Sequence, residues 1–270
     1  MGKTSLASDL RWPTEAAMVA EFSAWAVHCG WNVYPETCSW DLLLVRPTDG
    51  FQIGVEAKLS LNATVLCQVL SRQSRYDRGA GPDCRAILAP RPKTVNGLET
   101  IARHLGIVVV TGSAYARYRT RPRNWTGPEF TPGLPEISRR HSDTTDEMSA
   151  WGGWPEMCPD VRHALPEYVP DVTGGHPAPL QLTPWKIQAI KAAVVIEIVG
   201  YLTRADLKAL KLDPSRWTQF WLEPRAEKRW APGDRRHPPN FKAQHPTNYA
   251  QIKADVAVWG AGVPSLSPAP

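Results

Sequence analysis

The chain has 270 residues, of which 43% are hydrophobic and 21% charged, and its formal net charge is +5. This length predicts two domains, and the apolar content excludes a wholly disordered chain. No apolar run is long enough to cross a bilayer, so we expect no membrane partner. The five cysteines have no C-x-x-C spacing, which argues against structural zinc, and with no signal peptide they favour a reducing cytoplasm.

The first predicted helix follows Pro13, with Thr14 as its N-cap. Met18, Phe22 and Trp25 recur at i, i+4 and i+7. This spacing is typical of a helix that packs one face on a core.

Glu15 lies at the edge of that apolar stripe. A carboxylate near a buried face is costly unless it is paired or binds a ligand, so Glu15 is the first candidate for a functional acid in this helix. The helix dipole also favours an acid at this position without any function. Glu21 and Glu36 are the alternative acids.

Two strands are predicted next, at 39–45 and 51–59, joined by a Pro-Thr-Asp-Gly turn. The second alternates apolar and polar residues with a period of two, which places Glu56 and Lys58 on one face. Antiparallel pairing would bring Asp41 of the first strand close to them. Two carboxylates can hold a hard divalent cation, and a lysine beside them can orient water or stabilise negative charge. The alternative is an exposed cross-strand salt bridge.

The elements that follow are a helix at 62–70, a strand at 85–90, a helix at 99–106 that ends in a glycine, and a strand at 107–111. The predicted order is αββαβαβ over about residues 12–115. An acid in the first helix, an Asp on one strand and Glu-x-Lys on the next resemble the PD-(D/E)XK nuclease superfamily, which has the restriction-endonuclease-like fold. One departure is that Ser-Trp precedes Asp41 where that family can have Pro-Asp.

The resemblance implies an α/β domain with a mixed central sheet that hydrolyses phosphodiester bonds with Mg²⁺ or Mn²⁺. It implies metal ligands from two strand carboxylates, a helix acid and a main-chain carbonyl, namely Asp41, Glu56, Glu15 and Ala57. Lys58 would position the attacking water. Gln68 matches a polar position on the next helix that approaches the site in many members, and the alternative is a surface glutamine.

A second (D/E)-x-K match, Asp206-Leu-Lys208, lies in a segment with helical spacing. Residues i and i+2 do not share a helix face, so this match predicts a surface pair without chemistry.

From Arg117 to Pro184 the chain has eleven prolines and little periodicity, which predicts a linker. Arginines at its start form a basic cluster, namely Arg117, Arg119, Arg121 and Arg123. We therefore expect a nuclease-like domain, a linker, a helical nucleic-acid-binding domain and a tail, spanning 1–116, 117–182, 183–262 and 263–270.

The C-terminal part predicts a helix at 184–199, a short helix with Thr203 as N-cap, and a third helix that begins after Asp213. Two short helices joined by a tight turn resemble a helix-turn-helix, here of winged-helix type. A further helix is predicted at 248–258. The alternative is a small helical bundle for dimerisation or partner binding.

In the third helix, Trp217 and either Phe220 or Trp221 are expected to pack inward. The candidate contacts to phosphates and bases come from this helix and from the basic stretch after it, namely Arg216, Gln219, Arg225, Lys228, Arg229, Arg235 and Arg236. The resulting hypothesis is a metal-dependent DNA endonuclease. A DNA-binding regulator that does not cut and an RNA-directed nuclease are the alternatives, and cleavage of both strands would need a homodimer or two successive nicks.

Overall fold

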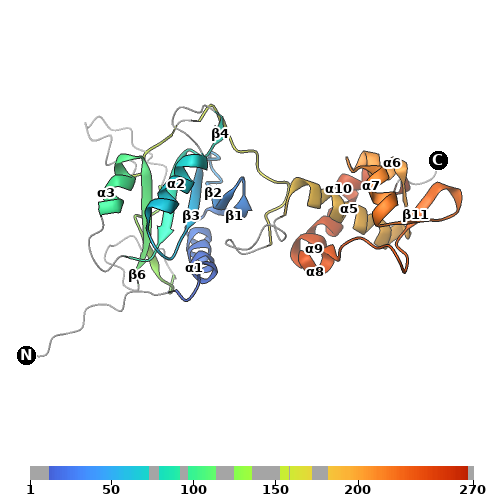
Figure 1. The fold of residues 1–270 in the computed structure, drawn as a ribbon, viewed down its shortest axis with the longest axis horizontal. Helices are drawn as coiled ribbons and strands as arrows, with labels where there is room; N and C mark the ends of the chain where they lie inside the picture. The colour runs from blue at the N-terminus through green and yellow to red at the C-terminus, as the bar shows by residue number, and fades with distance from the viewer. Residues whose placement is uncertain are drawn as a thin grey trace, which may run out of the picture. The chain divides into compact units, whose positions relative to one another are not determined.

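A computed structural model describes residues 12–72, 79–91, 97–113, 125–135, 153–157, 159–171 and 182–266. The chain divides into two compact units, shown in Figure 1. The N-terminal unit comprises Met1–Leu165 and Thr173–His176, and the C-terminal unit comprises Pro166–Val172 and Pro177–Pro270. The segment predicted as a linker therefore contributes residues to both units. The arginine cluster at 117–123 lies outside the described residues.

The N-terminal unit is a mixed α/β structure with a mixed central sheet, as predicted. The six strands, in the order β1-β2-β3-β5-β6-β7, are β1 (Asn32–Thr37), β2 (Trp40–Val45), β3 (Gln52–Ala57), β5 (Cys84–Ala89), β6 (Ile107–Ser113) and β7 (Glu129–Thr131). The first three pair antiparallel, β3, β5 and β6 pair in parallel, and β7 returns antiparallel to β6.

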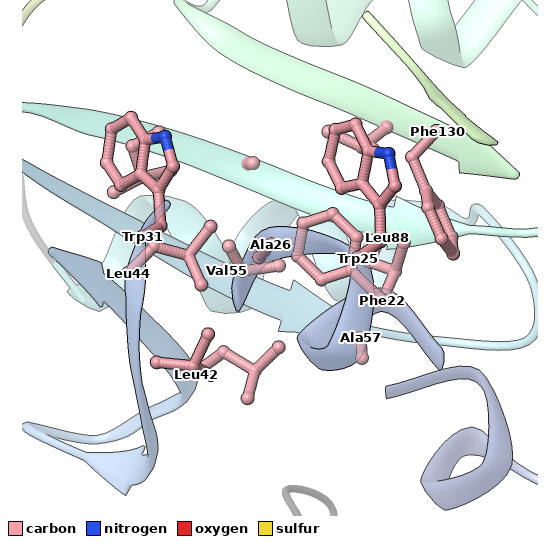
Figure 2. Close-up of a cluster of buried hydrophobic side chains, with 14 of the residues drawn as sticks. Phe22, Trp25, Ala26, Trp31, Leu42, Leu44, Val55, Ala57, Leu88 and Phe130 are labelled. Atoms are coloured by element: carbon pink, nitrogen blue, oxygen red, sulfur yellow. The ribbon is translucent and has the colours of Figure 1, made fainter. Parts of the chain in front are cut away.

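Helices cover both faces of this sheet, as the two separate buried clusters show. On one face α1 (Glu15–His28) buries Met18, Phe22 and Trp25 against β2, β3 and β5, so the predicted stripe is confirmed (Figure 2). On the other face α2 (Ala63–Arg72) and α3 (Gly97–His104) bury their apolar residues against β2, β5 and β6. Thr14 caps α1 by accepting a hydrogen bond from the Ala17 amide.

Strand β1 is absent from the predicted αββαβαβ order. It forms a hairpin with β2 in which Thr37 pairs with Trp40, so the turn consists of Cys38 and Ser39. Both have positive φ, 53° and 67°, as a two-residue hairpin turn of this type requires. Glycine or asparagine normally marks such a turn, and neither is present, so the sequence carries no signal for it.

The segment 159–165, which is far away in sequence, contacts the sheet at Gln52 of β3 and at Asp83, just before β5. The Gln52 side chain exchanges two hydrogen bonds with the main chain of His163, at 2.9 and 3.0 Å. Arg162 forms an ion pair with Asp83 at 2.8 Å, and β8 (Val161–Arg162) pairs in parallel with β4 (Ala80–Gly81). These contacts place the segment in the N-terminal unit.

The C-terminal unit begins with α5 (Pro184–Val199), which Thr183 caps and Gly200 ends in a left-handed conformation. The elements that follow are β9 (Leu202–Thr203), α6 (Arg204–Ala209), α7 (Pro214–Phe220), β10 (Glu223–Pro224), η2 (Ala226–Lys228), β11 (Arg229–Ala231), α8 (Phe241–Gln244), α9 (Pro246–Ala254), α10 (Val256–Trp259), η3 (Gly260–Gly262) and η4 (Pro264–Leu266). The three short strands form an antiparallel sheet in the order β10-β11-β9. The helix predicted at 248–258 is broken at Asp255 into α9 and α10.

The predicted surface pair at Asp206 is wrong, because Asp206 is completely buried. Its carboxylate accepts hydrogen bonds from the amide and hydroxyl of Thr203, both at 2.7 Å, and from the amide and hydroxyl of Ser265, at 2.8 and 2.6 Å. Thr203 in turn accepts from the Asp206 amide, which completes a capping box. The acid is thus a structural group that joins the start of α6 to η4.

Across the described ranges, no helix is both long and apolar enough to cross a membrane.

Candidate functional site

The register of β2 and β3 brings the two predicted strand carboxylates together. Leu42 pairs with Val55, so the next cross-strand pair is Asp41 and Glu56. Directly opposed residues of an antiparallel pair project from the same face. Val55 faces the cluster under α1, so Glu56 projects from the opposite face, where Arg72 of α2 contacts it.

Glu56 is a buried acid in contact with Arg72. Its side chain is 3% exposed, and its Oε2 lies 3.4 Å from Nη2 of Arg72, which is partly exposed. Burial and the charge of Asp41 raise the pKa of Glu56, and the charges of Arg72 and Lys58 oppose the rise without cancelling it. The ionised form of Glu56 is therefore held at a cost.

Asp41 is half-buried at the start of β2. Its Oδ2 accepts a hydrogen bond from the Ala57 amide at 2.8 Å, which ties the side chain to the end of β3. Burial raises the pKa of Asp41 and the charge of Glu15 adds to the rise, whereas the Ala57 hydrogen bond and the charges of Lys58 and Arg72 oppose it. Both strand acids thus have raised pKa values.

Lys58 follows β3 and carries the positive charge of the cluster on the α1 side. Its Nζ donates to Oε2 of Glu15 at 3.1 Å, and both side chains are about one-third exposed, at 30% and 35%. Burial lowers the pKa of Lys58, but the hydrogen bond to Glu15 and the charges of Asp41 and Glu56 outweigh it, so the net shift is upward. Lys58 is therefore an ammonium ion at neutral pH.

Glu15 is the helix acid that the structure brings to the cluster. Glu21, on the same helix, accepts a hydrogen bond from Nε1 of Trp12 at 2.8 Å instead. Glu36 lies in β1, the strand next to β2, where its φ is 47°.

Gln68 and Arg72 lie four residues apart on α2 and so share a helix face. Oε1 of Gln68 is buried, and the described structure contains no hydrogen-bond partner for it. Buried polar atoms are nearly always paired, so an orphan amide oxygen points to a missing water, ion or ligand. Arg72 was not predicted as a site residue, and its spacing from Gln68 is the signal that would have found it.

The oxygen atoms of the cluster are of the type that a hard divalent cation prefers, but few side chains supply them. Within the described ranges, no group of three or more His, Cys, Asp or Glu side chains is arranged to hold a metal ion. The two strand acids supply carboxylate oxygens, which Mg²⁺ and Mn²⁺ prefer, and the Ala57 carbonyl follows Glu56 directly. A cation between Asp41 and Glu56 would also lower both raised pKa values. The residues therefore fit such an ion.

The basic candidates of the C-terminal unit fall on two elements. Arg216 and Gln219 are exposed on α7, and Nη1 of Arg236 donates to the Thr218 carbonyl of that helix at 3.4 Å. Phe220 projects outward, and Trp221 is the residue that packs inward with Trp217.

The second group surrounds the β10–β11 connection, where Arg225 and Lys228 are exposed. Arg229 pairs with Glu227 at 2.9 Å and stacks 4.4 Å from the centre of the Tyr201 ring. Its charge is therefore partly engaged within the unit. The Arg235 amide donates to Oε1 of Glu223 on β10 at 3.1 Å.

No family model, curated protein or solved structure matches this chain. Its function has to be inferred from the carboxylate cluster of the N-terminal unit and from the surface of the C-terminal unit.

Proposed function

We propose that the chain is a metal-dependent nuclease that hydrolyses DNA phosphodiester bonds, with the C-terminal unit as its DNA-binding part. The observation that carries the proposal is the cross-strand pair of Asp41 and Glu56, with Lys58 beside it. Two adjacent carboxylates with raised pKa values are costly to a purely structural sheet, whereas a cation site needs them.

In this proposal Asp41 and Glu56 hold Mg²⁺ or Mn²⁺, with Glu15 and the Ala57 carbonyl as supporting ligands. A divalent ion there would supply electrostatic stabilisation of the negative charge that develops on the attacked phosphate. Lys58, already protonated, would orient the attacking water and share in neutralising that charge.

The two α2 residues would complete the site. The guanidinium of Arg72 can exchange Glu56 for a phosphate oxygen, because the present contact is long at 3.4 Å and the side chain is partly exposed. The buried Oε1 of Gln68 would accept a hydrogen bond from the attacking water and so help to orient it, which would satisfy an atom that has no partner in the described structure.

The arrangement of elements supports a restriction-endonuclease-like fold for the N-terminal unit. A helix, three antiparallel strands, a second helix and two parallel strands joined by a third helix follow one another in the main sheet and its covering helices, and the acids lie where the sheet changes from antiparallel to parallel. In the C-terminal unit, the order α5-β9-α6-α7-β10-β11 and the antiparallel sheet support a winged helix. Helix α7 would then be the recognition helix and the β10–β11 connection the wing.

Those two elements and the segment after β11 carry the proposed DNA contacts, which are Arg216, Gln219, Arg225, Lys228, Arg229, Arg235 and Arg236. One active site cuts one strand, so a double-strand break would need a homodimer or two successive nicks.

A second candidate is a DNA-binding regulator that does not cut. The observation that favours it is that both basic side chains of the cluster already pair with carboxylates, Lys58 with Glu15 and Arg72 with Glu56. Such a network also suits a structural role, and structural networks perturb pKa values as active sites do.

Cleavage of supercoiled plasmid and of single-stranded DNA with Mg²⁺ or Mn²⁺ tests the proposal. We expect wild type to nick DNA, EDTA to stop it, and Glu56→Gln and Lys58→Met to abolish it. Glu99→Gln is the matched control, since Glu99 forms an exposed ion pair with Arg103 on α3 of the same unit. Cleavage that survives Glu56→Gln would overturn the site. DNA binding without cleavage would support the regulator, and cleavage of RNA alone would change the substrate.

A further inference from the structure

The C-terminal unit carries large aromatic rings on its surface where α5 begins and α7 ends. Trp185, in the first turn of α5, is 45% exposed, and Phe220, the last residue of α7, is 57% exposed. Trp221 follows Phe220 in the chain, and its ring centre lies 5.9 Å from that of Trp185. We call Trp185, Phe220 and Trp221 the aromatic surface.

The aromatic surface has a rigid base. Trp221 packs almost perpendicular to Trp217, at 87° and 5.0 Å, and Trp217 is only 1% exposed. Trp185 also contacts the ring of Phe241, which is buried, at 6.5 Å. Tryptophans held in this way lose little conformational entropy when a ligand stacks on them, so the surface is prepared for binding.

Two arginines lie on or beside α7, the helix that carries Phe220. Arg216 lies one helical turn before Phe220 on the exposed face of α7, and Arg236 is bonded to the Thr218 carbonyl of the same helix. In the part of the chain that the structure describes, neither arginine has a carboxylate within ion-pair distance. Lys186 follows Trp185 directly. Aromatic rings with uncompensated arginines suit a ligand that combines flat rings with negative charge.

We propose that the aromatic surface stacks on unpaired bases, so that the C-terminal unit selects DNA with a single-stranded region, such as a fork, a flap or a loop. This rests on the proposed DNA binding by the same unit. In a duplex the faces of the bases are covered by their neighbours, and only their edges reach the grooves. Unpaired bases expose their faces to Trp185 and Phe220, while Arg216 and Arg236 bind the adjoining phosphates.

The test is fluorescence anisotropy with the full chain in EDTA, which prevents cleavage. The probes are labelled oligo(dT), a duplex of the same length and a forked duplex with oligo(dT) arms. The variants are Phe220→Leu and Trp185→Leu, which keep an apolar side chain but remove the flat ring. Val258→Leu is the control, because Val258 is an apolar residue of the same unit that is 81% exposed. Circular dichroism and sedimentation velocity on each variant establish its folding and its oligomeric state.

We expect wild type to bind the fork and oligo(dT) more tightly than the duplex. Each ring variant should weaken binding to the fork and oligo(dT) by about 5- to 100-fold, the range for loss of one base–aromatic stack, and change duplex binding little. The control should bind as wild type does.

Three results would overturn the inference. If the duplex binds as tightly as the fork and the ring variants change nothing, the aromatic surface does not stack bases, while the proposed DNA binding stands. If none of the probes binds, the proposed DNA binding fails as well. If wild type is a dimer and the ring variants are monomers with unchanged DNA affinity, the surface joins two copies of the chain.

Discussion

Gly54 is the position where one added methyl group should disturb the candidate site most directly. It lies in the middle of β3, two residues before Glu56, and the indole of Trp40 packs on it. A Cβ atom there would overlap with Cε2 and Cδ2 of the indole and lie 2.8 Å from its Cζ2. Trp40 is 1% exposed and immediately precedes Asp41, so the ring cannot move without shifting the start of β2.

Gly54→Ala should therefore destabilise the N-terminal unit by about 1–3 kcal/mol, the usual cost of an overpacked core. For a unit of this size that corresponds to a fall in melting temperature of roughly 2–12 °C. Trp40→Phe alone should also be destabilising because it leaves a cavity. In the double variant the smaller ring leaves room for the methyl group, so the loss should be smaller than the sum of the two single losses by about 0.5–3 kcal/mol.

Thermal unfolding followed by circular dichroism measures all four proteins. Gly133→Ala is the matched control, because a Cβ atom at Gly133 meets nothing within 4 Å, and it should melt as wild type does. The reasoning would be refuted if Gly54→Ala melted at the wild-type temperature, or if the double variant lost as much stability as the two single variants together.

Two further predictions concern buried acids with pKa shifts of opposite sign. Burial and the charge of Asp41 raise the pKa of Glu56, so ionisation of Glu56 lowers the stability of the folded chain above that pKa. Glu56→Gln removes this charge and should therefore raise the melting temperature at about pH 7.5 in EDTA. The gain in melting temperature should vanish near about pH 3, where Glu56 is protonated in the wild type as well. A less stable variant at neutral pH would contradict this. Burial opposes ionisation of Asp206, but hydrogen bonds from Ser265 and Thr203 outweigh it and lower its pKa. Asp206→Asn should lower the free energy of unfolding, measured by urea denaturation at neutral pH, by about 1–3 kcal/mol. The difference in stability between variant and wild type should narrow as the pH falls through the lowered pKa of Asp206. Equal stability of the two proteins at neutral pH would contradict this prediction.

The local patterns of the sequence predicted much of this structure. The alternation from Phe51 onward identified β3, because a strand's period of two depends only on the chain itself. The predicted shared face of Glu56 and Lys58 was wrong, because β3 ends at Ala57 and Lys58 pairs with Glu15 of α1, whereas Glu56 contacts Arg72 of α2. The N-caps Thr14, Thr203 and Asp213 were also predictable, since a capping side chain bonds an amide two or three residues away.

The features that the sequence did not reveal depend on residues far apart along the chain or on residue types that are unusual for the structure they form. Strand β1 was missed because Cys38 and Ser39 form its hairpin turn without glycine or asparagine. The burial of Asp206 depends on Ser265, which lies 59 residues further along the chain. The spacing of Arg72 from Gln68 indicates a shared helix face, but the contact of Arg72 with Glu56 follows from the packing of α2 on the sheet and so could not be predicted from that spacing.

The contacts of residues 159–165 with the sheet have a consequence for synthesis of the chain on the ribosome. Every residue of the carboxylate cluster has been translated by Arg72, and β6 is complete at Ser113. The partners of Gln52 and Asp83 are translated only with Arg162 and His163, about 3–10 s later at ordinary elongation rates. A nascent chain therefore passes through a stage in which the site can assemble while Gln52 and Asp83 still lack these partners, and that stage leaves this part of the sheet accessible to chaperones and proteases.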